Sequence, residues 1–193
     1  LAAAVLGYGD ATGRVNDSVK IWAEKTPYNE IYTRTIFDWW RHARVIQVVR
    51  DPRDNYVSYQ RKHPDWTAEK FASNWLWLVR VGLTYLAQYG AGRYWILKYE
   101  DLISEPEQTI LQLCAFLGIR NDPALFIPTR DGTAWEGNSM FAEKYRAISS
   151  STIGRWKEHI TPADLYTLQA IAQPGMQALG YVPESITRRP EAG

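Results

Sequence analysis

The sequence predicts an α/β protein in which helices cover both faces of a central parallel sheet, a three-layer sandwich. Residues 43–49 (ARVIQVV) and 94–99 (YWILKY) are largely apolar runs of strand length, which are typical of strands buried in a parallel sheet. A segment with helical signals follows each run. Strands that alternate with helices form parallel sheets, and ligands bind beyond the carboxyl ends of such strands.

The helix expected after the first run has three signals at its start. Asp51 is a good N-cap, Pro52 suits the first turn, and Asp54 places negative charge near the positive end of the helix. A long amphipathic helix is predicted from Thr67 to about Tyr89, because apolar residues recur there at helical spacing. A glycine-rich turn then leads to the second strand.

Two more helices are predicted in the second half of the chain. After the second strand, the segment EDLISEP leads into an apolar-faced helix that Gly118 closes. The last helix is expected to start after Thr161 and to stop near Gly175 or Gly180. Residues 122–151 are rich in Pro, Gly, Ser and Thr, which predicts irregular structure.

Length and composition indicate one ordered domain over residues 1–193, with residues 182–193 as a tail. The net charge of +1 does not favour a nucleic-acid partner, and no apolar stretch is long enough to span a membrane. Cys114 is the single cysteine, which excludes an internal disulfide and fits a reducing compartment, so a cytoplasmic location is expected.

Two groups of side chains receive no chemical role. The three histidines are scattered without the spacing of metal ligands, so no metal site is expected. Aromatic residues at helical spacing more often pack in a core than line a pocket, so we assign the tryptophans to the core: Trp39, Trp40, Trp75 and Trp77.

Arg50 stands where the first strand ends, and Ser58 follows eight positions later. A guanidinium, a hydroxyl and a helix N-terminus could converge on one phosphate. The structural alternative is an ion pair of Arg50 with Asp51 or Asp54, with Ser58 on an ordinary helix surface. Spacing alone does not favour the phosphate site over this alternative.

Four segments in order change that balance: WAEKTPYNE (22–30), RVIQVVRDPRDNYVSY (44–59), WILKYEDL (95–102) and SSTIGRWKEHIT (150–161). Together they resemble the sulfotransferases that use 3′-phosphoadenosine 5′-phosphosulfate, over residues 22–179. The resemblance implies the P-loop-NTPase-like sulfotransferase fold and transfer of a sulfuryl group to a hydroxyl or amine. It implies that Arg50 and Ser58 bind the donor's 3′-phosphate and that Tyr99 contacts the adenine.

The EKTP string carries the catalytic residues that the resemblance implies. Lys25 would stabilise charge on the transferring sulfuryl group, and Glu24 would be the general base, as in heparan-type members with this string. Cytosolic small-molecule members place a histidine base where this chain has Pro27, so a base at that position is excluded. The structural alternative for Glu24 and Lys25 is an exposed, solvated pair.

Two departures from the family pattern shape the expectation. No Gly-Thr-Thr loop for the 5′-phosphosulfate occurs upstream of Trp22, and the chain begins at Leu1, so we expect an N-terminally truncated chain. Cytosolic members carry Arg-Lys-Gly where this chain has three serines, and by resemblance Ser149 and Ser151 contact the donor. The serines should hold the 3′-phosphate more weakly than the two cations do.

Alternative functions stay open at this point. A nucleotide kinase-like phosphoryl transferase would also use a strand-to-helix arginine, although the chain has no Gly-Lys-Ser/Thr loop. A truncated relative without catalysis could keep the fold and bind a nucleotide or a partner. The acceptor could be a small molecule, lipid, carbohydrate or peptide, and the fold does not choose among them.

Overall fold

Two parallel strands form the centre of the structure. The computed structural model describes residues 21–127, 129–130, 133–134 and 150–185. Strands β1 (Val45–Val49) and β2 (Tyr94–Lys98) pair in parallel, with Val45 opposite Tyr94 and Val49 opposite Lys98. This confirms the predicted parallel sheet.

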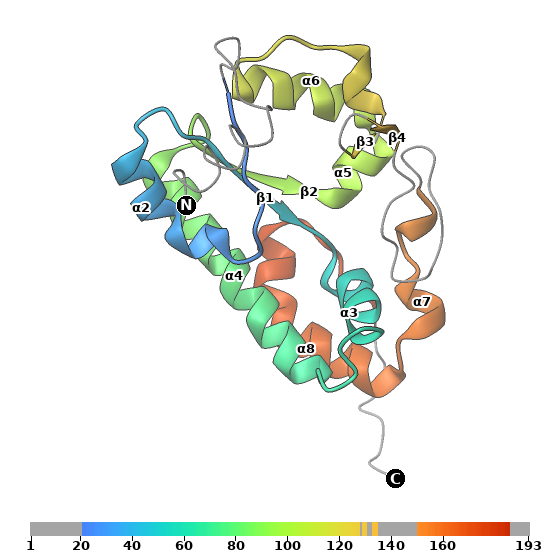
Figure 1. Ribbon diagram of the computed structural model, residues 1–193. Coiled ribbons are helices and arrows are strands. Elements are labelled where there is room, and N and C mark those ends of the chain that lie inside the picture. Colours follow the sequence, from blue (N-terminus) through green and yellow to red (C-terminus); the bar gives the residue numbers. More distant parts are fainter. Residues whose placement is uncertain (1–20, 128, 131–132, 135–149, 186–193) are drawn as a thin grey trace.

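Helices lie on both sides of this strand pair, which confirms the layered α/β architecture (Figure 1). Helices α4 (Ala68–Tyr89) and α8 (Pro162–Ala178) pack together on one side. Helix α6 (Pro106–Leu117) lies on the other, where Phe116 meets Trp95 of β2 with ring centroids 5.4 Å apart. The apolar core lies mainly between α4, α8 and the middle of α3 (Pro52–Gln60).

The helix starts follow the capping signals in the sequence. The Asp51 carboxylate accepts the backbone N–H of Arg53 at the start of α3. Thr67 accepts the N–H of Lys70 at the start of α4, and Thr161 accepts the N–H of Asp164 at the start of α8. Each bond satisfies a donor that the first helical turn leaves unpaired.

Helix α8 packs very closely against α4 at Gly175. A Cβ atom at this position would lie only 2.8 Å from Cζ3 of Trp75 and 3.0 Å from Cδ1 of Leu76. Glycine therefore allows the two helix backbones to approach.

Three differences from the sequence predictions concern local structure. The EDLISEP segment is largely helical, because helix α5 (Tyr99–Ser104) begins directly after β2. Trp39 and Trp77 are 68% and 46% exposed, so their assignment to the core is wrong, whereas Trp75 is buried as expected. Trp77 follows the buried Trp75 by two residues and therefore projects from nearly the opposite face of α4, and Trp39 is the last residue of α2.

Short elements complete the described chain. The region predicted to be irregular contains part of a small antiparallel hairpin, β3 (Thr129–Arg130) with β4 (Thr133–Ala134). The remaining elements are η1 (Asn29–Tyr32), α2 (Thr33–Trp39), η2 (Pro123–Phe126), η3 (Ser150–Thr152) and α7 (Trp156–His159).

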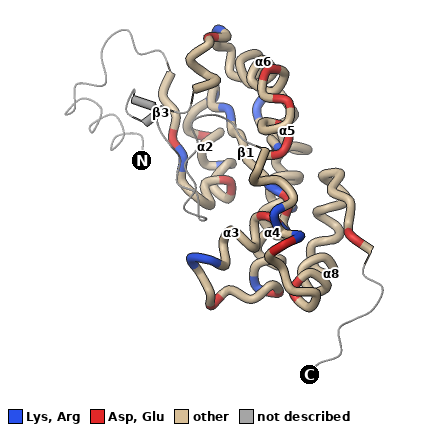
Figure 2. The backbone as a smooth tube through the Cα atoms, turned by 90° about the vertical axis from the view of Figure 1, so that its right-hand side faces the viewer, with Lys and Arg blue, Asp and Glu red and all other residues tan. Residues whose placement is uncertain are grey.

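Basic and acidic residues are interspersed along the described backbone rather than gathered by sign (Figure 2). This distribution agrees with the net charge of +1 and favours a local anion site over a broad charged surface. None of the helices in the described ranges is both long enough and apolar enough to cross a lipid bilayer.

Candidate active site

Arg50 and Tyr99 meet at the carboxyl edge of the sheet. Val49 and Lys98 are register partners, so the residues that follow them leave the two parallel strands side by side. The guanidinium carbon of Arg50 lies 4.9 Å from the centroid of the Tyr99 ring. The sheet topology therefore brings together two of the predicted donor-binding residues.

The Arg50 side chain is only partly satisfied by the protein. Its Nη2 donates to the backbone carbonyl of Thr152, while its buried Nε has no hydrogen-bond partner in the described part of the chain. The Trp75 indole N–H donates to the Arg50 carbonyl at 3.1 Å and fixes the backbone there. A buried donor without a partner is costly in free energy, so an anionic ligand would stabilise it.

Arg53, three residues further on, is fully engaged. Its guanidinium makes a bidentate pair with the Asp51 carboxylate, at 2.9 and 2.6 Å, and Nη1 donates to Gln169. The group also lies 4.4 Å from the ring centroid of Trp156. The structural ion pair considered for Arg50 is thus made by Arg53, because Asp51 faces Arg53.

Thr152 brings a third segment of the chain to the same place. Its hydroxyl and the Tyr99 hydroxyl are 2.9 Å apart and share a hydrogen bond. Its carbonyl accepts from Arg50, as described above. Thr152 therefore contacts both residues at the strand ends, although no sequence signal assigned it a role.

The two serines predicted in this third segment have different outcomes. Ser151, next to Thr152, is exposed, and its carbonyl accepts from the Arg155 side chain at 3.0 Å. Ser149 lies outside the described residues. The contacts of these serines with a donor therefore stay predictions.

Ser58 lies on α3, four residues after Asp54 as the spacing predicted. Its side chain is partly exposed, and the next residue, Tyr59, stacks on His63 with ring centroids 4.3 Å apart. Ser58 thus lies in the second turn of a helix that begins two residues after Arg50, and its contact with a donor stays a prediction.

The EKTP segment leads into η1, which packs against α4. The Glu24 carboxylate accepts hydrogen bonds from the Thr26 hydroxyl and the Asn29 side-chain amide, whereas Lys25 is exposed. Glu24 is thus held in place by its own turn and does not pair with Lys25. The Tyr28 hydroxyl lies 3.4 Å from the amide of Asn74, beside the Trp75 that contacts Arg50.

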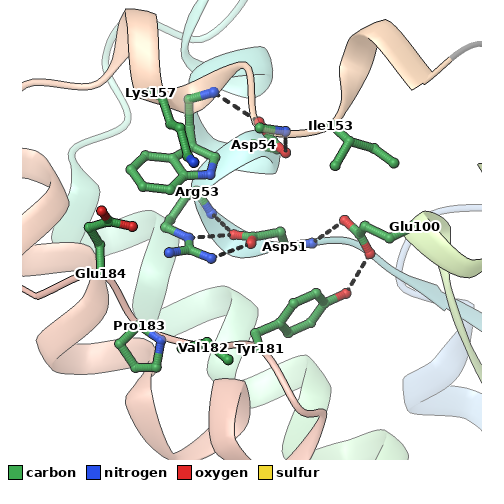
Figure 3. Close-up of a pocket in the computed structure, with 12 residues that line it drawn as sticks. Asp51, Arg53, Asp54, Glu100, Ile153, Lys157, Tyr181, Val182, Pro183 and Glu184 are labelled. Carbon is green, nitrogen blue, oxygen red and sulfur yellow. Dashed lines mark hydrogen bonds and ion pairs between the residues drawn. The ribbon is translucent and has the colours of Figure 1, made fainter. Parts of the chain in front are cut away.

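A pocket of about 290 Å³ lies beside the Arg53 network (Figure 3). Glu100 borders it and accepts the Asp51 backbone N–H and the Tyr181 hydroxyl, both at 2.8 Å. Burial, and then the Glu100 carboxylate, raise the pKa of Tyr181, so its hydroxyl keeps the proton that it donates. These bonds attach the first turn of α5 to the residue that follows Arg50.

The Asp54 carboxylate is buried beneath the segment that follows Thr152. It is 1% exposed and accepts the backbone N–H groups of Gly154 and Trp156. Burial raises the pKa of Asp54, and this outweighs the two amides and the Arg50 charge, which lower it. The sequence identified Asp54 as a first-turn acid and a possible ion-pair partner of Arg50, but not as an acceptor for these two amides.

Comparison with known proteins identifies the family. A model of the sulfotransferase family matches residues 2–123, more than half of the chain. The chain belongs to the sulfotransferase family. This membership favours the sulfotransferase hypothesis over the phosphoryl-transferase alternative.

Two curated relatives of this sulfotransferase-family chain show how much of a longer family member it covers. The 3-alpha-hydroxysteroid sulfotransferase of Cavia porcellus is 25% identical over 169 residues, which cover 74% of this chain and 58% of the relative. Sulfotransferase 2A1 of Macaca fascicularis is 24% identical over 167 residues, covering 71% and 58%. The chain thus spans somewhat more than half the length of these relatives.

Two solved structures share the fold of this sulfotransferase-family chain. The sulfotransferase domain from the curacin biosynthetic pathway has a TM-score of 0.66 at 22% identity, covering 93% of this chain and 68% of that one. The sulfotransferase domain of the Synechococcus PCC 7002 olefin synthase also has a TM-score of 0.66, at 23% identity, covering 93% and 64%. Both confirm the sulfotransferase fold expected from the sequence motifs.

Proposed function

We propose that this protein is a sulfotransferase that uses 3′-phosphoadenosine 5′-phosphosulfate as the sulfuryl donor. The observation that carries the proposal is the partly satisfied Arg50 guanidinium at the carboxyl edge of a parallel sheet. A cation with a buried N–H that no described residue pairs with fits a phosphate group, which accepts charge-assisted hydrogen bonds. Family membership supports assigning that phosphate to the donor.

The residues around Arg50 fit the two ends of a phosphorylated nucleoside. Ser58 would add a hydroxyl to the 3′-phosphate from the partly exposed side of α3, and Tyr99 would contact the adenine. Ser149 and Ser151 are proposed as further donor contacts on the strength of the family resemblance. The donor is bound without a metal ion in this proposal.

The EKTP segment would supply the catalytic groups. Glu24, oriented by Thr26 and Asn29, would take the proton of the acceptor hydroxyl as its oxygen attacks sulfur. Lys25, exposed and therefore free to turn toward a ligand, would stabilise negative charge as the bond to the phosphate oxygen breaks. The products would be a sulfated acceptor and 3′-phosphoadenosine 5′-phosphate.

The acceptor class is proposed from the relatives. Two of them, both from Cavia porcellus, are named hydroxysteroid sulfotransferases. We therefore propose a hydroxyl group on a small molecule as the acceptor, in the cytoplasm as expected from the sequence.

Ligand binding tests the donor assignment. Isothermal titration calorimetry should show that 3′-phosphoadenosine 5′-phosphate binds the wild type more tightly than adenosine 5′-diphosphate does. We expect Arg50→Ala to lose roughly 10- to 100-fold in affinity for the first ligand, as charge-assisted hydrogen bonds contribute about 1.5–3 kcal/mol.

Arg80→Ala is the matched control, because Arg80 is an exposed arginine on α4. It should bind both ligands as the wild type does. Equal affinity of the wild type for the two ligands would overturn the proposed donor.

A further inference from the structure

Asp54 connects the donor-site helix to a segment about 100 residues away in the sequence. Its Oδ2 accepts the Gly154 N–H at 2.7 Å, and its Oδ1 accepts the Trp156 N–H at 2.9 Å (Figure 3). Both carboxylate oxygens are therefore used, and the side chain is 1% exposed. Water barely reaches a carboxylate this buried. The two amide N–H groups therefore donate the hydrogen bonds that water would otherwise supply.

The bonds from Asp54 hold a tight turn that begins at η3. Gly154 has a φ of +76°, which L side chains rarely adopt. The turn also contains the bond from the Ile153 N–H to the Ser150 carbonyl, 3.0 Å long. On its far side the buried Trp156 ring packs against Arg53, so the turn is held at both ends.

Thr152 lies on this turn, two residues before Gly154. Because Asp54 fixes Gly154, it also limits where the Thr152 carbonyl and hydroxyl can lie. Those two groups contact Arg50 and Tyr99 respectively. A continuous series of contacts thus runs from Asp54 through the turn to both residues at the strand ends.

We infer that Asp54 is a positioning residue for the donor site, which acts through Thr152 on the orientation of Arg50 and Tyr99. This inference rests on the proposed donor and deepens it. A carboxylate suits the role because it offers two acceptors to two N–H donors. An asparagine offers one acceptor and turns its NH₂ group toward the second N–H.

The affinity ratio for two ligands tests the inference. The ligands are 3′-phosphoadenosine 5′-phosphate and adenosine 5′-phosphate, which differ only in the 3′-phosphate. We expect Asp54→Asn to weaken binding of the first ligand by about tenfold more than that of the second, because only the first ligand carries the phosphate that Arg50 would bind, whereas both carry the adenine that Tyr99 would contact. A merely structural role would lower both affinities together.

Tyr94→Phe is the control for loss of a buried polar contact. Tyr94 is buried at the amino end of β2, opposite the donor site, and its hydroxyl donates to the Gln47 side chain at 3.0 Å. It should reduce the free energy of unfolding and keep the ligand ratio of the wild type. The ratio is compared among variants at a temperature where each is folded.

The outcomes separate this inference from the proposed function. If the wild type does not prefer the 3′-phosphorylated ligand, the proposed donor fails and the inference fails with it. The inference alone is overturned by one combination of results: the wild type prefers the 3′-phosphorylated ligand, Arg50→Ala loses this preference, and Asp54→Asn retains it.

If Asp54→Asn does not fold, Thr152→Val tests a step that the inference requires, the contact of Thr152 with Tyr99. This nearly isosteric change removes the hydroxyl that contacts Tyr99 and leaves the turn intact. Combined with Tyr99→Phe in a double-mutant cycle, it should show losses in affinity for the 3′-phosphorylated ligand that are less than additive. Strictly additive losses would overturn the inference.

Discussion

Arg50 and Arg53 show how two similar residues differ once their surroundings are known. Arg53 is buried among Asp51, Gln169 and the Trp156 ring, which together satisfy its guanidinium. Arg50 has a buried Nε without a partner in the described chain. The sequence motif RDPR does not distinguish these roles, whereas the hydrogen bonds do.

Glu24→Gln tests the proposed general base. We expect kcat for sulfuryl transfer to a hydroxyl acceptor to fall about 100-fold or more, because an amide cannot accept the proton. Affinity for 3′-phosphoadenosine 5′-phosphate should not change, since Gln can keep a bond to Thr26 or Asn29. Steady-state turnover and calorimetric binding of the intact protein measure the two effects.

Glu30→Gln is the control for Glu24→Gln, because Glu30 lies in the adjoining η1 element and has no assigned catalytic role. It should leave kcat near the wild-type value. An unchanged kcat in Glu24→Gln would show that another group is the base.

At the scale of elements, the contact of α4 with α8 depends on one glycine. We expect Gly175→Ala to lower the free energy of unfolding by about 1–2 kcal/mol, because its Cβ would lie 2.8 Å from the buried Trp75 ring. The gain in helix propensity, about 1 kcal/mol, offsets only part of the clash. Urea denaturation followed by circular dichroism measures the change.

Gln177→Ala, an exposed change in the same helix, should alter the free energy of unfolding by less than about 0.5 kcal/mol. If Gly175→Ala were as stable as the wild type, the close approach of the two helices would not constrain this position.

The sequence predicted helix starts well where they depend on hydrogen bonds between neighbouring residues. The starts of α3, α4 and α8 follow from Asp51, Thr67 and Thr161, whose side chains bond to the first helical turn. Helix α5 was missed because its six residues are too few for a periodic apolar pattern to be visible. Its start is held by tertiary bonds of Glu100 to Asp51 and Tyr181.

At the scale of the whole molecule, Asp54 links stability to pH. Burial raises its pKa in the folded chain above the ordinary value of 3.8, against the lowering effect of the Gly154 and Trp156 amides and Arg50. The folded state therefore binds the proton more tightly than the unfolded chain does. This contribution to stability is fully present below about pH 3.8 and is lost as pH rises through the folded pKa.

The free energy of unfolding of the wild type, relative to that of Asp54→Asn, should therefore fall as pH rises from about 3.5 to about 7. Urea titrations of both proteins across this range measure the difference, and the other titrating groups largely cancel. A difference that increased with pH would show that the folded protein holds Asp54 in its ionised form more strongly than water does.

The sequence by itself determined the strand-to-helix units, the helix caps, the family resemblance and the candidates Arg50, Ser58 and Tyr99. These depend on spacing and side-chain chemistry within short segments. Only the tertiary structure decided that Arg53 takes the ion pair, that Asp54 holds Gly154, and that Thr152 meets Arg50 and Tyr99. Some of those contacts join residues about 50 to 100 positions apart in the sequence. Others decide which of two neighbouring arginines pairs with Asp51. The partner of a buried polar group depends on three-dimensional geometry and on the cost of desolvation, and a local sequence pattern contains neither.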